Sequence, residues 1–239
     1  MQETAKTLVE IVSHVIQRHP ELRKILGTEH ETDTHMNEWK SRAFEPPAPT
    51  SVKHATLLRH QIPQSTWVET GTFKGDTTIF LSKLAKHIFT IEPDLKLYDN
   101  AKLRFSNHPN ITAINDISEI ALPLILKTIS GPVCFWLDGH HSGEGTFAGP
   151  NDTPILFELR AIAEQISNFS GVRVFIDDVR CFMGIRHIYG NYPSLNELVH
   201  WASDHGFEWT IEHDIFIAKT PTESSLALPI AMPGAMEKS

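Results

Sequence analysis

Carboxylate and amide side chains follow five short apolar segments of this sequence, each of which we predict to be a buried strand. They are Glu69, Glu92, Asn115-Asp116, Asp138 and Asp177-Asp178. Ligands of an open parallel sheet bind outside the carboxyl ends of its strands, so these positions are the first candidates for a site. A single acidic residue there is often only a turn former or a helix cap. Five such ends in series are hard to explain by capping alone.

Asp138, Asp177 and Asp178 carry the most specific chemistry, because two neighbouring strands would bring them to one crevice. Like charges this close repel one another and raise each other's pKa unless a cation neutralises them. Hard divalent cations such as Mg2+ bind a few carboxylates together with water and substrate oxygens. No lysine or arginine stands at these two strand ends, and the nearest cation in the sequence is Arg180. The pattern predicts a Mg2+ or Mn2+ site, with ion pairs to Arg180 as the competing interpretation.

A glycine turn follows the first predicted strand, where residues 67–78 read WVETGTFKGDTT. Gly71 and Gly75 let the backbone approach a polar ligand, and the first N–H groups of the helix that follows are unpaired. No Lys-Ser/Thr pair follows Gly75, which excludes a phosphate-binding loop. Phe73 stands where the dinucleotide fingerprint has its second glycine. An ordinary turn between a strand and a helix is the alternative.

The remaining pattern, Glu-x-Gly-x-x-x-Gly, resembles the first motif of class I S-adenosylmethionine-dependent methyltransferases, and residues 90–94 (TIEPD) are similar to the second. The resemblance covers about residues 65–219. It implies that Glu92 accepts the ribose hydroxyls, a placement that also fits NAD, and that Asn115-Asp116 flanks the adenine. For that pair, a helix-start turn is an equal alternative. The implied cofactor-binding residues are Glu69, Gly71, Thr72, Phe73, Gly75, Thr77, Glu92, Asn115, Asp116 and Asp138.

The acidic strand ends look like those of the divalent-metal-dependent small-molecule O-methyltransferases, the catechol and caffeoyl-CoA type and the macrolide-sugar type. This resemblance implies that Asp138, Asp177 and Asp178 hold the metal. The catechol type has a lysine base three positions beyond its first metal-binding aspartate, whereas this chain departs from the pattern with His141. Histidine titrates near neutrality and suits that role. His140 is the rival, and either histidine could instead be a metal ligand or a loop residue, so the catalytic candidates are His141, Asp138 and His140.

Strand and helix patterns alternate through most of the chain, which predicts right-handed βαβ units and a parallel sheet. Strands are expected at 65–70, 87–92, 111–115, 133–137, 172–176, 208–212 and 215–219. Helices are expected at 52–60, 75–86, 94–106, 118–129, 153–167 and 194–205. The last two strands are separated only by His213-Asp214, so one of them must run antiparallel to its neighbours. The prediction is a Rossmann-like, seven-stranded methyltransferase sheet with helices on both faces.

Three regions flank or interrupt this pattern. Residues 1–50 are expected to form a helical N-terminal extension, with helices at 4–18 and 20–26 and a loop over 28–50. The extension could cover the active site or build a homodimer. Residues 51–219 form the expected cofactor-binding domain, and residues 220–239 a disordered tail. Residues 139–152 contain four glycines and are interpreted as a substrate lid or a passive surface loop.

Composition narrows the classes of partner. The 239 residues include 29 acidic and 21 basic side chains, for a net charge of −8. The sequence contains no cluster of basic residues. Nucleic acid is therefore a disfavoured partner. The start of the sequence lacks a signal pattern and no apolar run reaches membrane length, so we expect a cytoplasmic protein without a membrane partner. The two cysteines are expected to be reduced.

The sequence thus predicts an S-adenosylmethionine-dependent methyltransferase that acts on a hydroxyl of a small molecule, such as a natural product, a sugar or a catechol, with a divalent metal. Enzymes that methylate bases or glutamine amides usually carry Asn/Asp-Pro-Pro-Tyr/Phe after the fourth strand, whereas this chain carries Asp-Gly-His-His. The alternatives are a metal-independent N- or O-methyltransferase of the same fold and a non-catalytic binding protein. An NAD-dependent oxidoreductase is weaker, because the central glycine of its fingerprint is missing.

Overall fold

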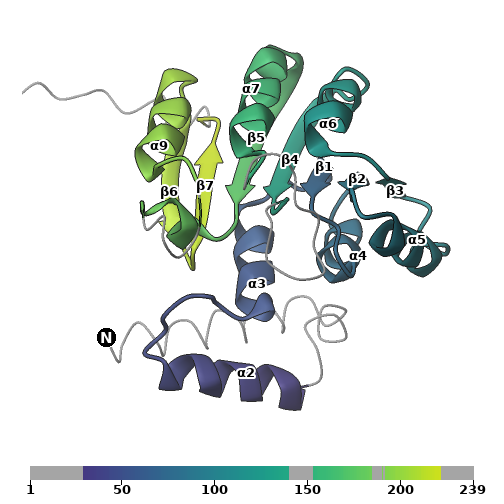
Figure 1. The fold of residues 1–239 in the computed structure, drawn as a ribbon. Helices are drawn as coiled ribbons and strands as arrows, with labels where there is room; N and C mark the ends of the chain where they lie inside the picture. The colour runs from purple at the N-terminus through teal and green to yellow at the C-terminus, as the bar shows by residue number, and fades with distance from the viewer. Residues whose placement is uncertain (1–28, 140–152, 185–189, 191, 222–239) are drawn as a thin grey trace, which may run out of the picture.

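The computed structural model describes residues 29–139, 153–184, 190 and 192–221. Its centre is one seven-stranded sheet in the order β3-β2-β1-β4-β5-β7-β6 (Figure 1). The strands are β1 (Thr66–Thr70), β2 (His87–Ile91), β3 (Ile111–Ile114), β4 (Gly131–Leu137), β5 (Phe169–Ile176), β6 (Glu208–Glu212) and β7 (Ile215–Lys219). All seven predicted strands are present, with ends that differ from the prediction by a few residues at most.

The first five strands are parallel and the last two form a hairpin. β1 pairs with β2 and β4, β2 with β3, and β4 with β5, all in parallel. β7 is antiparallel to both β5 and β6. His213 and Asp214 have φ of 52° and 69°, as a two-residue hairpin turn requires. This topology is the Rossmann-like methyltransferase sheet and confirms the predicted fold class.

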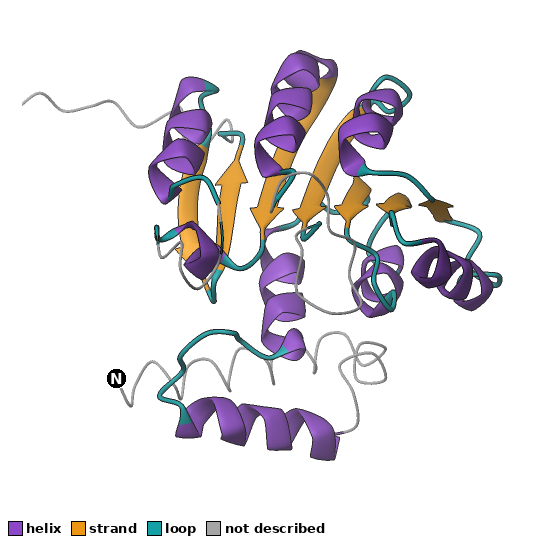
Figure 2. Cartoon of the chain, viewed as in Figure 1, coloured by secondary structure: helices purple, strands orange, loops and turns teal. Residues whose placement is uncertain are grey.

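Helices cover both faces of the sheet (Figure 2). They are α3 (Thr50–His60), α4 (Asp76–Ser82), α5 (Leu95–Arg104), α6 (Ser118–Leu126), α7 (Ile155–Gln165) and α9 (Leu195–Asp204), with 3₁₀ turns η2 (Ile166–Asn168) and η3 (Val179–Phe182). Pro123 lies inside α6 and does not divide it. Buried Leu122 and Leu126 anchor this helix on the sheet and outweigh the local preference for a break. None of the described helices has the length and apolar character needed to cross a membrane.

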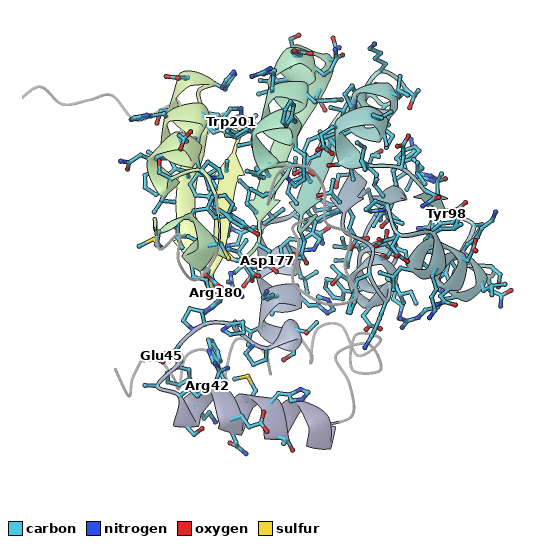
Figure 3. All side chains as sticks on the ribbon, in the orientation of Figure 1. Arg42, Glu45, Tyr98, Asp177, Arg180 and Trp201 are labelled. Atoms are coloured by element: carbon cyan, nitrogen blue, oxygen red, sulfur yellow. The ribbon has the colours of Figure 1, made fainter. Side chains whose placement is uncertain are left out.

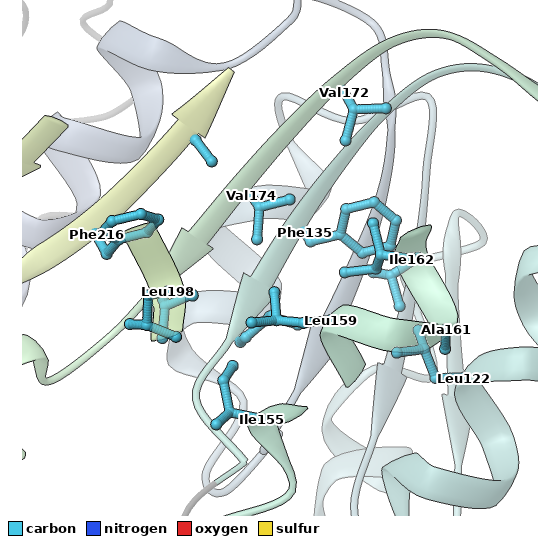
Figure 4. Close-up of a cluster of buried hydrophobic side chains, with 14 of the residues drawn as sticks. Leu122, Phe135, Ile155, Leu159, Ala161, Ile162, Val172, Val174, Leu198 and Phe216 are labelled. Carbon is cyan, nitrogen blue, oxygen red and sulfur yellow. The ribbon is translucent and has the colours of Figure 1, made fainter. Parts of the chain in front are cut away.

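Alternating strand residues build two cores, one on each face of the sheet. Val68 and Phe135 face α6, α7 and α9, where they join Leu122, Leu159 and Leu198 (Figure 4). Their chain neighbours Trp67 and Trp136 face the other way and pack with Leu57 of α3 and with Phe80 and Leu81 of α4. This period of two follows from the pleat of a strand. The second core fixes α3 and α4, which carry residues of the site described below.

The prediction of a loop over residues 28–50 is wrong, because α2 (Glu29–Ser41) occupies much of this range. Met36 and Trp39 of α2 are buried against Ala48 and Val52. The Trp39 ring nitrogen donates a hydrogen bond to the carbonyl oxygen of Glu45 at 3.0 Å. Few apolar residues mark this helix, so its face is too narrow for periodicity to reveal, and tertiary packing stabilises it. The helices predicted at 4–18 and 20–26 lie outside the described residues, as does the predicted tail (220–239) from residue 222 onwards. Thr220, the first residue of that tail, donates its backbone amide to the Val172 carbonyl oxygen at 3.1 Å.

Candidate functional site

The carboxyl ends of β1, β4 and β5 point towards the N-terminal helices. In Figure 1, α3 lies directly below the ends of β4 and β5, and α2 lies beyond it. The chain from Glu29 to His60 therefore borders the edge of the sheet at which an α/β protein binds its ligands. The two roles that the sequence left open for the N-terminal extension, covering the site or building a homodimer, stay predictions.

The turn after β1 is held by the strand beside it. The amides of Gly71 and Thr72 both donate to the Ile91 carbonyl oxygen, at 3.0 and 3.3 Å. Gly71 has φ +85°, and a Cβ there would lie 2.5 Å from the backbone oxygen of Asp138. Gly75, the N-cap of α4, has φ +80°. Both glycines are therefore required by the fold itself, whether or not a ligand approaches the turn.

Glu69 is a buried carboxylic acid beneath this turn, only 1% exposed. Its Oε2 accepts hydrogen bonds from the hydroxyls of Thr78 at 2.5 Å and Thr90 at 2.6 Å, and Thr90 also contacts the Thr72 hydroxyl at 2.6 Å. Its Oε1 has no hydrogen-bond partner among the described residues. Burial raises the pKa of Glu69 to about 7, although the two hydroxyl hydrogen bonds oppose the rise. Such a group changes its charge close to physiological pH.

Glu92, which directly follows β2, contacts the same turn through its side chain. Its Oε2 accepts a hydrogen bond from the amide of Phe73 at 2.8 Å, and its Oε1 accepts one from the amide of Asp94 at 3.0 Å. Burial raises its pKa, and these two amides oppose the rise. Each carboxylate oxygen can accept a second hydrogen bond, so Glu92 can hold the turn and still bind a hydroxyl. The Phe73 side chain is exposed, at φ 49°.

Asn115 and Asp116 stabilise the chain after β3. The Asn115 amide nitrogen donates to the carbonyl oxygens of Glu92 at 2.8 Å and Pro93 at 3.2 Å. Asp116 accepts a hydrogen bond from the amide of Ile117 at 2.8 Å. These contacts give both residues a structural role, which is the alternative that the sequence left open. Their placement beside Glu92 also keeps them close to any ligand bound there.

Two basic residues meet the acids that follow β5. The Lys53 ammonium contacts Oδ2 of Asp177 and lies 3.2 Å from Oδ1 of Asp178. One guanidinium nitrogen of Arg180 lies 2.7 Å from the same Asp178 oxygen and also contacts Asp214. Figure 3 shows Asp177 above α3, with Arg180 close by. The sequence named Arg180 as a possible partner and missed Lys53 altogether.

The charges of this group are strongly coupled. Burial lowers the pKa of Lys53, but the carboxylates of Asp177, Asp178 and Asp138 together outweigh burial and raise it above its ordinary value. Burial raises the pKa of Asp177, whose side chain is only 3% exposed, and the Lys53 ammonium opposes that rise. Oδ1 of Asp177 has no hydrogen-bond partner among the described residues. The group therefore presents one buried carboxylate oxygen that can accept a further hydrogen bond.

The described residues do not fit the divalent metal that the sequence predicted. No group of three histidine, cysteine, aspartate or glutamate side chains in the described part of the chain could hold a metal ion. Oxygens of Asp177 and Asp178 are already bound by Lys53, and Asp178 is bound by Arg180 as well. His140 and His141, together with the glycine-rich segment over 140–152, lie outside the described residues.

His54, the neighbour of Lys53 on α3, is a second residue that the sequence did not single out. Its ring stacks on Phe80 with 4.1 Å between centroids, and its Nε2 lies 3.3 Å from the Thr77 hydroxyl. Burial lowers its pKa to about 4, so the ring is neutral at physiological pH. His54 thus connects α3 to the first turn of α4. The helix predicted at 52–60 contained both residues, but nothing in its sequence marked either of them as part of a site.

Solved structures with similarity to this chain share little of its sequence. No family model matches the sequence, and no curated protein resembles it closely in sequence. Similar solved structures include a proposed methyltransferase of Streptococcus mutans in complex with SAH (17% identity, TM-score 0.48, covering 73% of this chain and 97% of that one). Others are an rRNA methylase of Streptococcus thermophilus (15%, 0.41, 73% and 95%) and the N-methyltransferase NodS of Bradyrhizobium japonicum (14%, 0.47, 70% and 92%).

The strand order, the antiparallel β7 and the acidic carboxyl edge define a protein of the Rossmann-like methyltransferase fold class. The similar structures named above are distant from this chain, with 14–17% identity and TM-scores below 0.5. The function of this chain must therefore be argued from its own residues.

Proposed function

We propose that this protein is an S-adenosylmethionine-dependent methyltransferase that acts on a hydroxyl group of a small molecule. The observation that carries the proposal is the turn between Glu69 and Glu92. Two buried acids, Glu69 on β1 and Glu92 directly after β2, border a glycine turn at the carboxyl edge of the sheet. One oxygen of Glu69 has no partner among the described residues. A buried carboxylate oxygen without a partner is costly, and a bound donor would relieve that cost.

The residues of the turn suit the proposed cofactor. S-adenosylmethionine, when bound, supplies an electrophilic methyl group on a positively charged sulfur. Glu92 would accept hydrogen bonds from the ribose hydroxyls, because each of its oxygens can accept a second bond beside those from the amides of Phe73 and Asp94. Glu69 lies deeper, where an ionised carboxylate would favour a cationic ligand. Asn115 and Asp116 border the same end of β3 and would contact the adenine.

Asp177 is the residue that we assign to the acceptor. Its Oδ1 is buried and has no partner in the described part of the chain, so it can accept a hydrogen bond from an acceptor hydroxyl. Such a contact would orient the oxygen for attack and hold its proton as the methyl group is transferred. His141, with His140 as its rival, remains our proposal for the base that finally removes that proton.

The acidic character of the chain supports a small acceptor over nucleic acid. A net charge of −8 disfavours the binding of a polyanion. Because the described residues do not fit a metal, we assign no step of the reaction to one.

Calorimetric titration with SAH and with NAD tests the proposal directly. We expect SAH to bind and NAD not to bind. Glu92→Ala should weaken SAH binding about 10- to 100-fold, the loss expected for hydrogen bonds to a charged group. Glu164→Ala, on the exposed part of α7, removes a carboxylate far from the turn and should bind SAH like the wild type.

Glu92 also holds two backbone amides, so a loss of binding must be separated from a loss of structure. Circular dichroism and thermal unfolding should show that Glu92→Ala keeps the fold. If the folded variant binds SAH as tightly as the wild type, Glu92 does not contact the cofactor. If the wild type binds NAD and not SAH, the proposed function is wrong.

A further inference from the structure

We propose that the ammonium of Lys53 is the resident cation of the Asp177–Asp178 pair and takes the place of a divalent metal, so that this site works without one. The proposal rests on the proposed function only where it concerns methyl transfer. That Lys53 and a metal ion cannot both bind the two aspartates follows from the geometry of the site alone.

The ammonium lies where a bridging metal would have to bind. It contacts Oδ2 of Asp177 and reaches Oδ1 of Asp178, so it spans the two carboxylates. Divalent cations bind carboxylate oxygens at about 2.0–2.6 Å. A metal that bridged the same two oxygens would meet the ammonium at contact distance, and the two positive charges would repel. The pair can therefore hold one of the two cations.

Lys53 reaches the acids from a helix that is fixed independently of them. Leu57, one turn along α3, is fully buried in the core between α3, α4 and the sheet. Farther along the helix, Arg59 and His60 both contact Glu212, the last residue of β6. The helix that carries Lys53 is thus fixed by Leu57 in the core and by Glu212 at the end of β6. The Lys53 side chain is only 16% exposed.

A second basic side chain, that of Arg180, also disfavours a metal ion at the two aspartates. Arg180 lies 2.7 Å from Oδ1 of Asp178, the same oxygen that Lys53 approaches, and it also contacts Asp214. The amide of Arg180 donates to Asp214 at 2.9 Å, which fixes the residue at the start of η3. One oxygen of Asp178 is therefore shared by two basic side chains, which leaves it poorly suited to a metal ion.

The arrangement has a consequence for the acceptor. Because Lys53 binds Oδ2 of Asp177, it sets the orientation of the carboxylate and leaves Oδ1 as the oxygen without a partner among the described residues. A metal would have polarised the acceptor oxygen by direct contact. Here the acceptor would instead contact a carboxylate whose position is fixed by a lysine. Lys53 is in this sense a positioning residue.

Manganese binding tests the inference without knowledge of the acceptor. Protein stripped with EDTA and saturated with SAH is titrated with Mn2+, and free Mn2+ is measured by electron paramagnetic resonance. The wild type should bind no stoichiometric Mn2+. Lys53→Met leaves the two carboxylates without their ammonium and should bind one equivalent, with affinity at least about tenfold above the wild type, because a repelling unit charge has gone. Lys53→Arg retains a cation and should resemble the wild type.

Arg59→Met is the matched control. It also removes a basic side chain from α3, but Arg59 pairs with Glu212 and not with the two aspartates. It should bind no more Mn2+ than the wild type does. One equivalent of Mn2+ bound by the wild type would overturn the inference, a result that needs no variant to fold. A folded Lys53→Met that still binds no Mn2+ would show that Lys53 is not what excludes the metal.

The outcome is independent of the cofactor test. If SAH fails to bind, the Mn2+ titrations are repeated without it. If the wild type then binds no Mn2+ and Lys53→Met binds it, the proposed function fails but the exclusion of metal by Lys53 is upheld. If SAH binds and the wild type also takes up Mn2+, the function stands and the inference alone is lost.

Discussion

The variant Glu69→Gln isolates a strongly perturbed acid beneath the turn that follows β1. Glu69 is fully enclosed, with Thr78 and Thr90 donating to one oxygen and the other oxygen without a partner in the described part of the chain. Glutamine has nearly the same shape, keeps an oxygen that can accept from the two threonines, and never carries a negative charge. The difference between the two proteins therefore reports the cost of ionising a buried carboxyl group.

The sign and size of the effect follow from the pKa of Glu69. Burial raises it from 4.5 to about 7, so the folded protein binds this proton more tightly than the unfolded chain does. The stability contributed by the proton is fully present below pH 4.5 and is lost as pH rises through about 7. At about 1.4 kcal/mol per pKa unit, the free energy of unfolding falls by about 3 kcal/mol across this window. Glu69→Gln should lack this fall.

The assay is urea unfolding of both proteins at a series of pH values from below 4.5 to above 7. We expect the stability of Glu69→Gln relative to the wild type to increase across this range and then to level off. Thr90→Val should shift the window to higher pH, because it removes a donor that stabilises the ionised form. Glu164→Gln, at the surface of α7, is the control for simple loss of a carboxylate. A stability difference that does not change with pH would refute the reasoning.

Two further variants test how the fold holds the site. Gly71→Ala should lose about 1–3 kcal/mol or more in thermal unfolding, because its Cβ would lie 2.5 Å from the Asp138 carbonyl oxygen at φ +85°. Gly206→Ala has a similar φ of +71° with open space around it, so an equal loss in both variants would disprove the steric part of the argument. Leu57→Ala should lose about 2–5 kcal/mol in urea unfolding, because the side chain is fully buried under α3. Leu58→Ala, which is only partly buried, should lose clearly less, and an equal loss would show that α3 is not anchored through Leu57.

The sequence alone determined the sheet and the acidic residues at its carboxyl edge. Strand periodicity is local, because a pleated strand alternates its side chains whatever its partners are, so Val68 and Trp67 could be assigned to opposite faces before their neighbours were known. The two residues between β6 and β7 likewise forced an antiparallel pair. The placement of Glu69, Glu92 and Asp177 at strand ends followed from the same patterns.

Only the tertiary structure decided what those acids contact. Lys53 and Asp177 are separated by 124 positions in the chain, so no local pattern could pair them, and the sequence predicted a metal where a lysine lies. Helix α2 was missed for a similar reason, since Met36 and Trp39 are stabilised by Ala48 and Val52 after a reversal of the chain. A carboxylate's position can be predicted from the strand that carries it. Its charge partner depends on long-range packing, which here brings α3 across the end of the sheet.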